Sequence, residues 1–131
     1  MAQKYIKGDV VMYYNKITVI KRLREEDCFD LFCPKEQLTY CFVDIKKMKP
    51  IPLTHEILEK NGWYGSTHSK QSADNTKILY KTFKRKGYPT IKVSQDLKIT
   101  CELSPFIVKL ESVSDLQHLL FGLGLNSEME V

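Results

Sequence analysis

The sequence lacks the features that define several large classes of protein. No apolar run approaches the roughly 18 residues that a membrane-spanning helix needs, and none follows the charged residues near the N-terminus as in a signal peptide. With only 6 glycines and 5 prolines in 131 residues, collagen-like and low-complexity chains are excluded as well. We therefore expect a soluble protein of the cytoplasm that makes no membrane contact.

Motifs of catalysis and of phosphate binding are also missing. The chain has no Gly-x-Gly-x-x-Gly or Gly-Lys-Ser loop, no Gly-x-Ser-x-Gly elbow and no His-Glu-x-x-His pair. Its 3 histidines, His55, His68 and His118, stand far apart in the sequence. We expect no enzyme, no cofactor and no metal site. A cysteine and a histidine that meet only in the folded chain remain an open alternative as a nucleophile pair.

The cysteines are few and irregularly spaced. The chain has 4 of them, Cys28, Cys33, Cys41 and Cys101, without any Cys-x-x-Cys pair, so zinc-ribbon spacings are absent. Each lies among apolar or aromatic residues, which is typical of a small buried hydrophobic side chain. The sequence therefore predicts reduced, buried thiols, with a disulfide or a metal site as the less favoured alternatives.

What the chain does contain suits a small globular protein. Its 43% hydrophobic and 11% aromatic content is too high for a disordered chain. The 20 Lys and Arg against 16 Asp and Glu give a net charge of +4, a mild excess compared with dedicated duplex-binding domains. The positive residues concentrate at Lys46–Lys49 and Lys81–Lys86. These two runs are either solvated strand ends or an anionic-ligand surface.

The first half of the chain has the pattern of a small β-sheet. Short β-branched and aromatic runs recur at intervals of about ten residues, which is typical of a strongly bent sheet or SH3-like barrel. Asn15-Lys16 between the first two runs predicts a hairpin turn, and the charged residues 22–27 read as a strand end plus loop. The strands are expected at residues 9–14, 17–20, 28–33, 38–44 and, for a short fifth, within 46–53.

The second half predicts a short helix, further strands and a closing helix. Thr54 is a good N-cap for the short helix, which should end at Asn61-Gly62. The polar residues Gly65–Thr76 read as one long loop. Strands are expected at residues 78–83, 90–93, 97–103 and 106–110. After them, Ser112 or Ser114 should cap a helix whose leucine stripe packs on the sheet.

The predicted fold class is therefore α+β. We expect a strongly bent N-terminal sheet or SH3-like small barrel in residues 1–53. The short helix, an antiparallel β-meander and the C-terminal packing helix should follow in residues 54–131, and the two parts should form one compact unit.

Candidate ligand-binding residues gather around the only tryptophan. Trp63 and Tyr64 stand between the short helix and the polar loop, where Trp63 either caps the core or joins Tyr64 as an aromatic platform for a base. In the second interpretation, basic side chains supply phosphate contacts. Seven tyrosines also allow a protein-binding face. The full candidate set is Trp63, Tyr64, Lys84, Arg85, Lys86, Tyr88, Arg22, Arg24 and His68.

Two segments resemble sequence motifs shared by small proteins of Bacteroidales phages and prophages. Residues 50–63 read PIPLTHEILEKNGW, where the family has Ile-Pro-Leu-Thr, an acidic residue, Glu-Ile-Leu, then Lys, a small polar residue, Gly and an aromatic residue. Residues 113–123 read VSDLQHLLFGL and are similar to the family's closing helix, with departures at Asp115, His118, Leu120 and Gly122. The order of elements is similar over nearly the whole chain. The shared residues are helix caps and packing positions, so the resemblance implies fold and phage origin and assigns no catalytic residue.

A phage origin implies a small non-enzymatic protein that acts in the cytoplasm of the host cell. Small β-rich phage proteins of other families sequester nucleotide signals of host immunity as oligomers, and the mild positive charge together with Trp63 and Tyr64 fits that role. We therefore expect a homo-oligomeric, anti-defence protein that sequesters a small anionic nucleotide. The alternatives are a host-protein-binding adaptor or inhibitor and, less favoured, a nucleic-acid-binding module.

Overall fold

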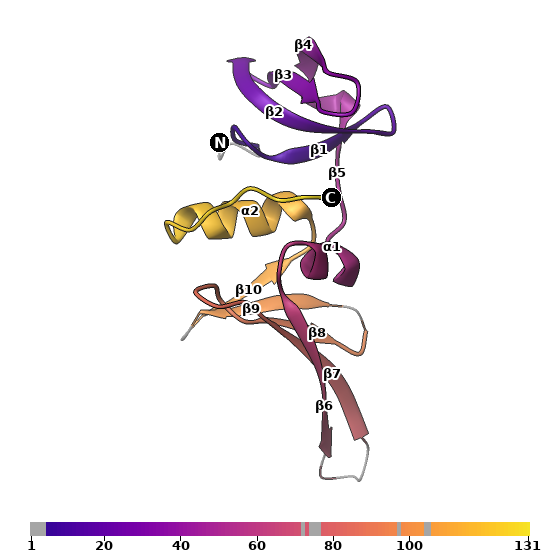
Figure 1. Ribbon diagram of the computed structural model, residues 1–131, viewed down its shortest axis with the longest axis vertical. Helices are drawn as coiled ribbons and strands as arrows, with labels where there is room; N and C mark the ends of the chain where they lie inside the picture. Colours follow the sequence, from indigo (N-terminus) through magenta and orange to yellow (C-terminus); the bar gives the residue numbers. More distant parts are fainter. Residues whose placement is uncertain (1–4, 72, 74–76, 97, 104–105) are drawn as a thin grey trace. The chain divides into compact units, whose positions relative to one another are not determined.

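The structure is a computed structural model that describes residues 5–71, 73, 77–96, 98–103 and 106–131 (Figure 1). The chain divides into two compact units. The first contains residues 1–52, 112–129 and 131, and the second contains residues 53–111 and 130. The α+β class expected from the sequence is confirmed, with two antiparallel sheets and a C-terminal helix.

The first unit is built on a five-stranded antiparallel sheet in the order β4-β3-β2-β1-β5. Register shifts between Ile20 and Arg22 and between Leu23 and Glu25 bend β2, and β5 returns to pair with β1. The result is the bent sheet that the strand spacing predicted. Its elements are β1 (Val10–Tyr13), β2 (Lys16–Glu25), β3 (Cys28–Cys33), β4 (Leu38–Asp44), the 3₁₀ helix η1 (Ile45–Lys47) and β5 (Met48–Pro50).

Of two local expectations for this sheet, one was wrong. The hairpin between β1 and β2 turns at Tyr14 and Asn15, not at Asn15-Lys16; both residues have positive φ, 46° and 61°, as a type I′ turn requires. The strand end plus loop expected at residues 22–27 is confirmed: Arg22 and Leu23 pair with Asp30 and Phe29 of β3 at the end of β2, and a turn follows at residues 26–27.

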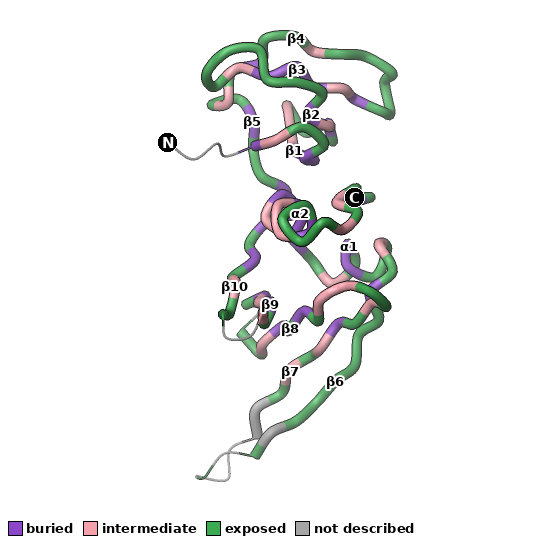
Figure 2. The backbone as a smooth tube through the Cα atoms, turned by 90° about the vertical axis from the view of Figure 1, so that its left-hand side faces the viewer, coloured by how far each residue is buried: buried purple, intermediate pink, exposed green. Residues whose placement is uncertain are grey.

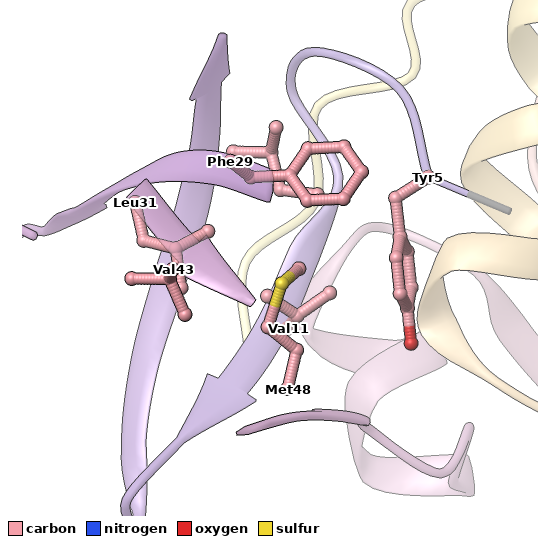
Figure 3. Close-up of a cluster of buried hydrophobic side chains, with 7 residues drawn as sticks. Tyr5, Val11, Phe29, Leu31, Val43 and Met48 are labelled. Atoms are coloured by element: carbon pink, nitrogen blue, oxygen red, sulfur yellow. The ribbon is translucent and has the colours of Figure 1, made fainter. Parts of the chain in front are cut away.

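A cluster of buried side chains forms the core of the first unit (Figure 3). Tyr5 packs its ring edge-on against Phe29, with 6.2 Å between the ring centroids. Burial of each large apolar side chain contributes about 1.5–3 kcal/mol relative to exposure. The cluster consists of Tyr5, Val11, Ile20, Phe29, Leu31, Val43 and Met48.

The closing helix α2 (Val113–Gly122) belongs to the first unit, whereas the sequence grouped it with residues 54–131. The physical reason is a set of hydrogen bonds from Gln117, which is buried. Its side-chain oxygen accepts from the backbone N–H of Val10 at 2.8 Å, and its side-chain nitrogen donates to Gly8 O at 2.8 Å. Ser112 is the N-cap and forms a capping box with Asp115.

The second unit starts with the short helix α1 and continues as an antiparallel meander in the order β10-β9-β8-β7-β6. Thr54 caps α1 as predicted, and Gly62 takes a left-handed conformation just after it. The elements are α1 (His55–Lys60), β6 (Tyr64–Gln71), β7 (Lys77–Lys84), β8 (Ile91–Ser94), β9 (Ile99–Leu103) and β10 (Phe106–Leu110).

The predicted loop Gly65–Thr76 was wrong for its first part. Residues 65–71 form most of β6, which pairs with β7 from Tyr64↔Lys84 to Gln71↔Lys77. Residues 72 and 74–76 of the predicted loop lie outside the described residues, as does residue 97 of the strand expected from 97 to 103. From Tyr64 to Ser69 every residue is exposed (Figure 2). A strand at the edge of a sheet with both faces exposed to solvent shows no alternation of apolar and polar residues. Its sequence therefore resembles that of a loop.

In the other strands of this sheet, the buried apolar side chains lie mainly on one side, which we call the inner face. On the apolar side, a Cβ atom at Gly65 would come within 2.8 Å of Phe83, so the glycine allows that ring to pack across the strand. The buried members of this inner face are Phe83, Ile91, Val93, Ile99, Cys101 and Leu110. We call the opposite side the outer face; it carries mainly polar residues together with the exposed Ile107.

Candidate functional site

Trp63 is a core residue of the second unit. Its ring is only 1% exposed and meets Tyr88 edge-on at 5.4 Å between centroids, while its ring N–H points to Pro89 O at 3.4 Å. The guanidinium of Arg85 lies 5.1 Å from the Trp63 centroid and 3.9 Å from the Tyr88 centroid. The sequence thus correctly associated Trp63, Arg85 and Tyr88. The structure contradicts the aromatic platform for Trp63, however, because the ring offers no open face to a base.

Arg85 holds this cluster against the end of α1. Its Nε would lie 3.3 Å from a Cβ atom at Gly62, so the side chain rests on that glycine. A cation above two aromatic rings stabilises their packing by about 0.5–2 kcal/mol. We infer that Arg85 has a mainly structural role, while Lys86 stays exposed on the same turn.

Arg22 and Arg24 belong to the first unit, where both pair with Asp30. Arg24 Nε lies 2.7 Å and Arg22 Nε 3.2 Å from an Asp30 carboxylate oxygen, and Phe42 donates its backbone N–H to the other oxygen at 3.1 Å. Burial acts to raise the pKa of the Asp30 carboxyl, but the Phe42 hydrogen bond and the two guanidinium groups outweigh it and lower the pKa below its usual value. Both arginines therefore neutralise a buried carboxylate of their own unit, and their predicted role as phosphate ligands stays a prediction.

The remaining predicted residues, Tyr64, His68 and Lys84, lie on β6 and β7 with their side chains on the outer face. Tyr64 pairs with Lys84, and Tyr64 is 79% exposed. His68 Nε2 lies 2.9 Å from the Thr82 hydroxyl oxygen. The predicted set thus divides among an aromatic core cluster, an ion-paired cluster and an open sheet surface.

A different group of residues surrounds a hollow of about 320 Å³ in the first unit. Its lining residues are Met12, Tyr14, Asn15, Lys46, Lys47 and Lys49, and we call it the lysine pocket. Two local structures build it. The positive φ angles of the β1–β2 turn project Tyr14 and Asn15. Pairing of β1 with β5 sets Met12 opposite Lys49.

The cationic side of the lysine pocket depends on η1. Asp44 is the N-cap of η1 and accepts the backbone N–H of Lys46 at 2.9 Å. This cap holds Lys46 and Lys47 in one turn beside Lys49 of β5. None of the lining residues is acidic, so the wall of the pocket contains three lysines and no carboxylate. An anion in the pocket would relieve their mutual repulsion.

The aromatic side of the lysine pocket is Tyr14, which is 65% exposed. Tyr14 meets Tyr13 edge-on at 4.6 Å between centroids, and Tyr13 in turn meets Tyr40 at 5.1 Å. Tyr40 is anchored by hydrogen bonds with Lys16 and Glu36 at 2.9 and 2.8 Å. This chain of ring contacts orients Tyr14 while leaving much of its surface open to a ligand.

Sequence reasoning identified only part of this site. The run Lys46–Lys49 was recognised as one of two basic segments, and Asn15 was assigned to the hairpin turn. Their convergence with Tyr14 follows from the β1–β5 pairing, which joins residues far apart in the sequence. No local pattern reports that pairing.

A second hollow of the first unit, of about 490 Å³, has mainly apolar walls. It is lined by Lys7, Gly8, Val19, Ile20, Lys21, Phe32 and Pro34. Because Val19, Ile20 and Phe32 carry no hydrogen-bonding side-chain atoms, this groove suits an anionic ligand less well than the lysine pocket does.

The cysteines differ in exposure. All four are free thiols, of which Cys33 and Cys101 are buried, as predicted. Cys28 is half-buried and Cys41 is exposed, so the prediction of burial was wrong for these two. Within the described residues, no group of three His, Cys, Asp or Glu side chains is arranged to hold a metal ion.

The fold and these surfaces define a small α+β protein with two antiparallel sheets and a lysine-lined pocket. Comparison with protein-family models, with curated proteins and with solved structures finds no match. In the part of the chain that the structure describes, neither helix has the length and apolar character needed to cross a membrane.

Proposed function

We propose that this protein binds an anionic nucleotide in the lysine pocket and sequesters it without chemical change. The observation that carries the proposal is the convergence of Lys46, Lys47 and Lys49 with Tyr14 and Asn15 around one hollow. A nucleotide has a flat base, a polar base edge and one or more phosphates, and the pocket offers a complementary group for each.

The phosphates would lie among the three lysines. Each ammonium group supplies up to three donors, and hydrogen bonds between ionised partners are stronger than neutral ones. The base would stack on the exposed Tyr14 ring. The Asn15 amide, which both donates and accepts, would contact the base edge or the sugar.

The volume of about 320 Å³ lies at the lower end of the range for small-molecule sites, about 300–1,000 Å³. It suits one nucleotide unit. A cyclic dinucleotide would extend beyond it and would require the pocket of a second copy, in agreement with the homo-oligomer expected from the sequence. The resemblance to phage proteins supports a host-cytoplasmic, anti-defence role for such binding.

Isothermal titration calorimetry tests the proposal with mononucleotides, cyclic di- and trinucleotides, ADP-ribose derivatives and inorganic phosphate. We expect at least one nucleotide to bind with submicromolar affinity and to be recovered intact after the protein is denatured. Lys47→Ala should weaken binding about tenfold or more, because it removes one charge-assisted contact. Lys35→Ala, at an exposed lysine outside the pocket lining, is the matched control.

Tyr14→Asn tests the aromatic part of the site. Asparagine tolerates the left-handed conformation of Tyr14, so the turn should persist while the ring is lost. The rival function is binding to a host protein through the same exposed surface. The rival is favoured if none of the nucleotides binds and if the wild type, but not Tyr14→Asn, captures a host protein. Recovery of a chemically altered ligand would instead indicate an enzyme.

A further inference from the structure

We infer that the outer face of the second sheet binds single-stranded nucleic acid. This inference is independent of the lysine pocket, because it concerns the other unit and shares no residue with the pocket. It rests on the cross-strand register, on one stacked group of side chains and on the distribution of charge.

The register gives the outer face a continuous polar row across all five strands. Residues paired directly across neighbouring strands point to the same side of a sheet. The row runs through Ser66, Thr82, Lys92, Thr100 and Lys109. Ser66, Lys92 and Lys109 are exposed, and the two threonines are half-buried. Hydroxyl and ammonium groups therefore cover the middle of this face.

A stacked group lies next to that row. The His68 ring packs on the Tyr80 ring with 5.3 Å between centroids and 22° between planes. The ammonium group of Lys92 lies 4.6 Å from the Tyr80 centroid. Because β6 and β8 lie on either side of β7, His68 and Lys92 approach Tyr80 from opposite neighbouring strands.

His68 is held in position and remains accessible. Its Nε2 contacts the Thr82 hydroxyl at 2.9 Å, and the residue is exposed on the edge strand β6. A base stacked on His68 would extend the existing ring pair, and Tyr64, also exposed on β6, would offer a second ring. Exposed aromatic rings on a sheet are the usual platform for unpaired bases.

The charges on this face match a phosphate backbone. The outer side of β7 and β8 carries Lys84 and Lys92, and the printed sequence has no Asp or Glu in β6, β7 or β8. Lys109 on β10 is paired with Glu111 at 3.4 Å, and Glu102 lies on the outer side of β9. Asp96 follows β8, accepts a hydrogen bond from the Ser94 hydroxyl and lies 3.6 Å from the Lys98 ammonium group. The outer side of β7 and β8 therefore presents the cationic groups of Lys84 and Lys92 near the stacked group.

These features favour single-stranded nucleic acid over other ligands. None of the hollows described above is lined by outer-face residues, so a free nucleotide would be held from one side only. A single-stranded nucleic acid instead presents successive bases and phosphates, so several weak contacts with the sheet can add up to stable binding. A duplex hides the base faces that His68 and Tyr64 would contact.

Fluorescence anisotropy with labelled oligouridylate and oligothymidylate of about twelve nucleotides, a length within the usual single-strand site range, tests this inference. The matched pair of variants is Lys92→Gln and Lys81→Gln. Both remove one exposed positive charge from neighbouring strands of the same sheet, but Lys81 pairs with Val93 on the inner side.

We expect Lys92→Gln to weaken binding about fivefold or more and to reduce the slope of log affinity against log salt by about 0.7, the value for one phosphate contact with a single strand. Lys81→Gln should change the affinity less than about twofold, since screened charges away from the strand contribute little. His68→Ala should also weaken binding, with an unchanged salt slope, because it removes stacking and no phosphate contact. Circular dichroism confirms that each variant is folded.

Three results would overturn the inference. Equal losses for Lys92→Gln and Lys81→Gln would show non-specific attraction by net charge. If Lys47→Ala loses oligonucleotide binding and Lys92→Gln keeps it, the single-stranded nucleic acid binds in the lysine pocket. Absence of binding at low salt would remove single-stranded nucleic acid as the ligand, and the nucleotide titrations would still decide the proposed function separately.

Discussion

His118 of α2 and Asp9 before β1 form a close pair, with 2.6 Å between His118 Nε2 and an Asp9 carboxylate oxygen. The same oxygen accepts the backbone N–H of Ile6 at 2.9 Å. Together with Gln117, this pair ties the closing helix to the start of the first sheet. Burial raises the pKa of the Asp9 carboxyl, and its contacts with Ile6 and His118 offset that effect only in part.

The raised pKa of Asp9 predicts a definite pH dependence. The folded state binds the Asp9 proton more tightly than the unfolded state does. The contribution of Asp9 to the free energy of unfolding is therefore fully present below the ordinary pKa of an aspartate. It is lost as the pH rises through the raised folded-state pKa. The free energy of unfolding of the wild type, relative to that of Asp9→Asn, should therefore fall between about pH 4 and pH 7. Urea unfolding of both proteins at several pH values measures it, and a constant difference would contradict the prediction.

Asp30 should show the opposite sign. Because its pKa is lowered, its contribution is present above the ordinary Asp value and is lost as the pH falls through the lowered folded-state pKa. Asp30→Asn should lower the unfolding midpoint at neutral pH, since Arg22 and Arg24 lose their shared partner. The difference from wild type should shrink in acid. Thermal melts at neutral and acidic pH compare the two proteins.

Packing of α2 predicts a strong contrast between two leucines. Leu116 is fully buried, and Leu116→Ala should cost about 2–5 kcal/mol through lost burial and the cavity left behind. Leu116→Asp should be more severe, because it buries an unpaired charge. Leu123 is 44% exposed, so Leu123→Ala is the control and should cost less than about 0.5–1 kcal/mol. Similar unfolding midpoints for Leu116→Ala and Leu123→Ala would disprove the buried position of Leu116.

Arg85 should affect stability more than nucleotide affinity. Arg85→Ala removes the cation above Trp63 and Tyr88, with an expected cost of about 0.5–2 kcal/mol. Trp63 is the only tryptophan, so its fluorescence reports on this cluster directly. We expect altered emission with unchanged affinity in the nucleotide titrations. A large loss of affinity in a folded Arg85→Ala variant would restore the ligand-binding role predicted from the sequence.

The four thiols should react in a fixed order. Cys41 is exposed and should be alkylated first. Cys28 should follow more slowly, because burial and then the nearby carboxylates of Asp44, Glu25 and Asp27 raise its pKa and reduce its thiolate fraction. Cys33 and Cys101 should react only on unfolding. Time-resolved mass spectrometry after alkylation gives the order, and early labelling of Cys101 would contradict it.

Much of the secondary structure was predictable because its signals are local. The predicted ranges of β3, β4 and β10 agree with the structure, and Thr54 caps α1 as expected. Of the two caps expected for α2, Ser112 and Ser114, the structure selects Ser112. Apolar runs between turn residues and capping side chains act within a few residues of one another.

The sequence by itself determined the α+β class, most strands, both helix starts and the two basic runs. Tertiary structure decided that residues 65–71 form an edge strand, since only pairing with β7 distinguishes such a polar segment from a loop. It also decided that Trp63 is buried, that Arg22 and Arg24 pair with Asp30, and that Tyr14 joins the lysines of η1 and β5. Each of these outcomes depends on free energy from contacts between residues distant in the chain, which local propensity does not contain.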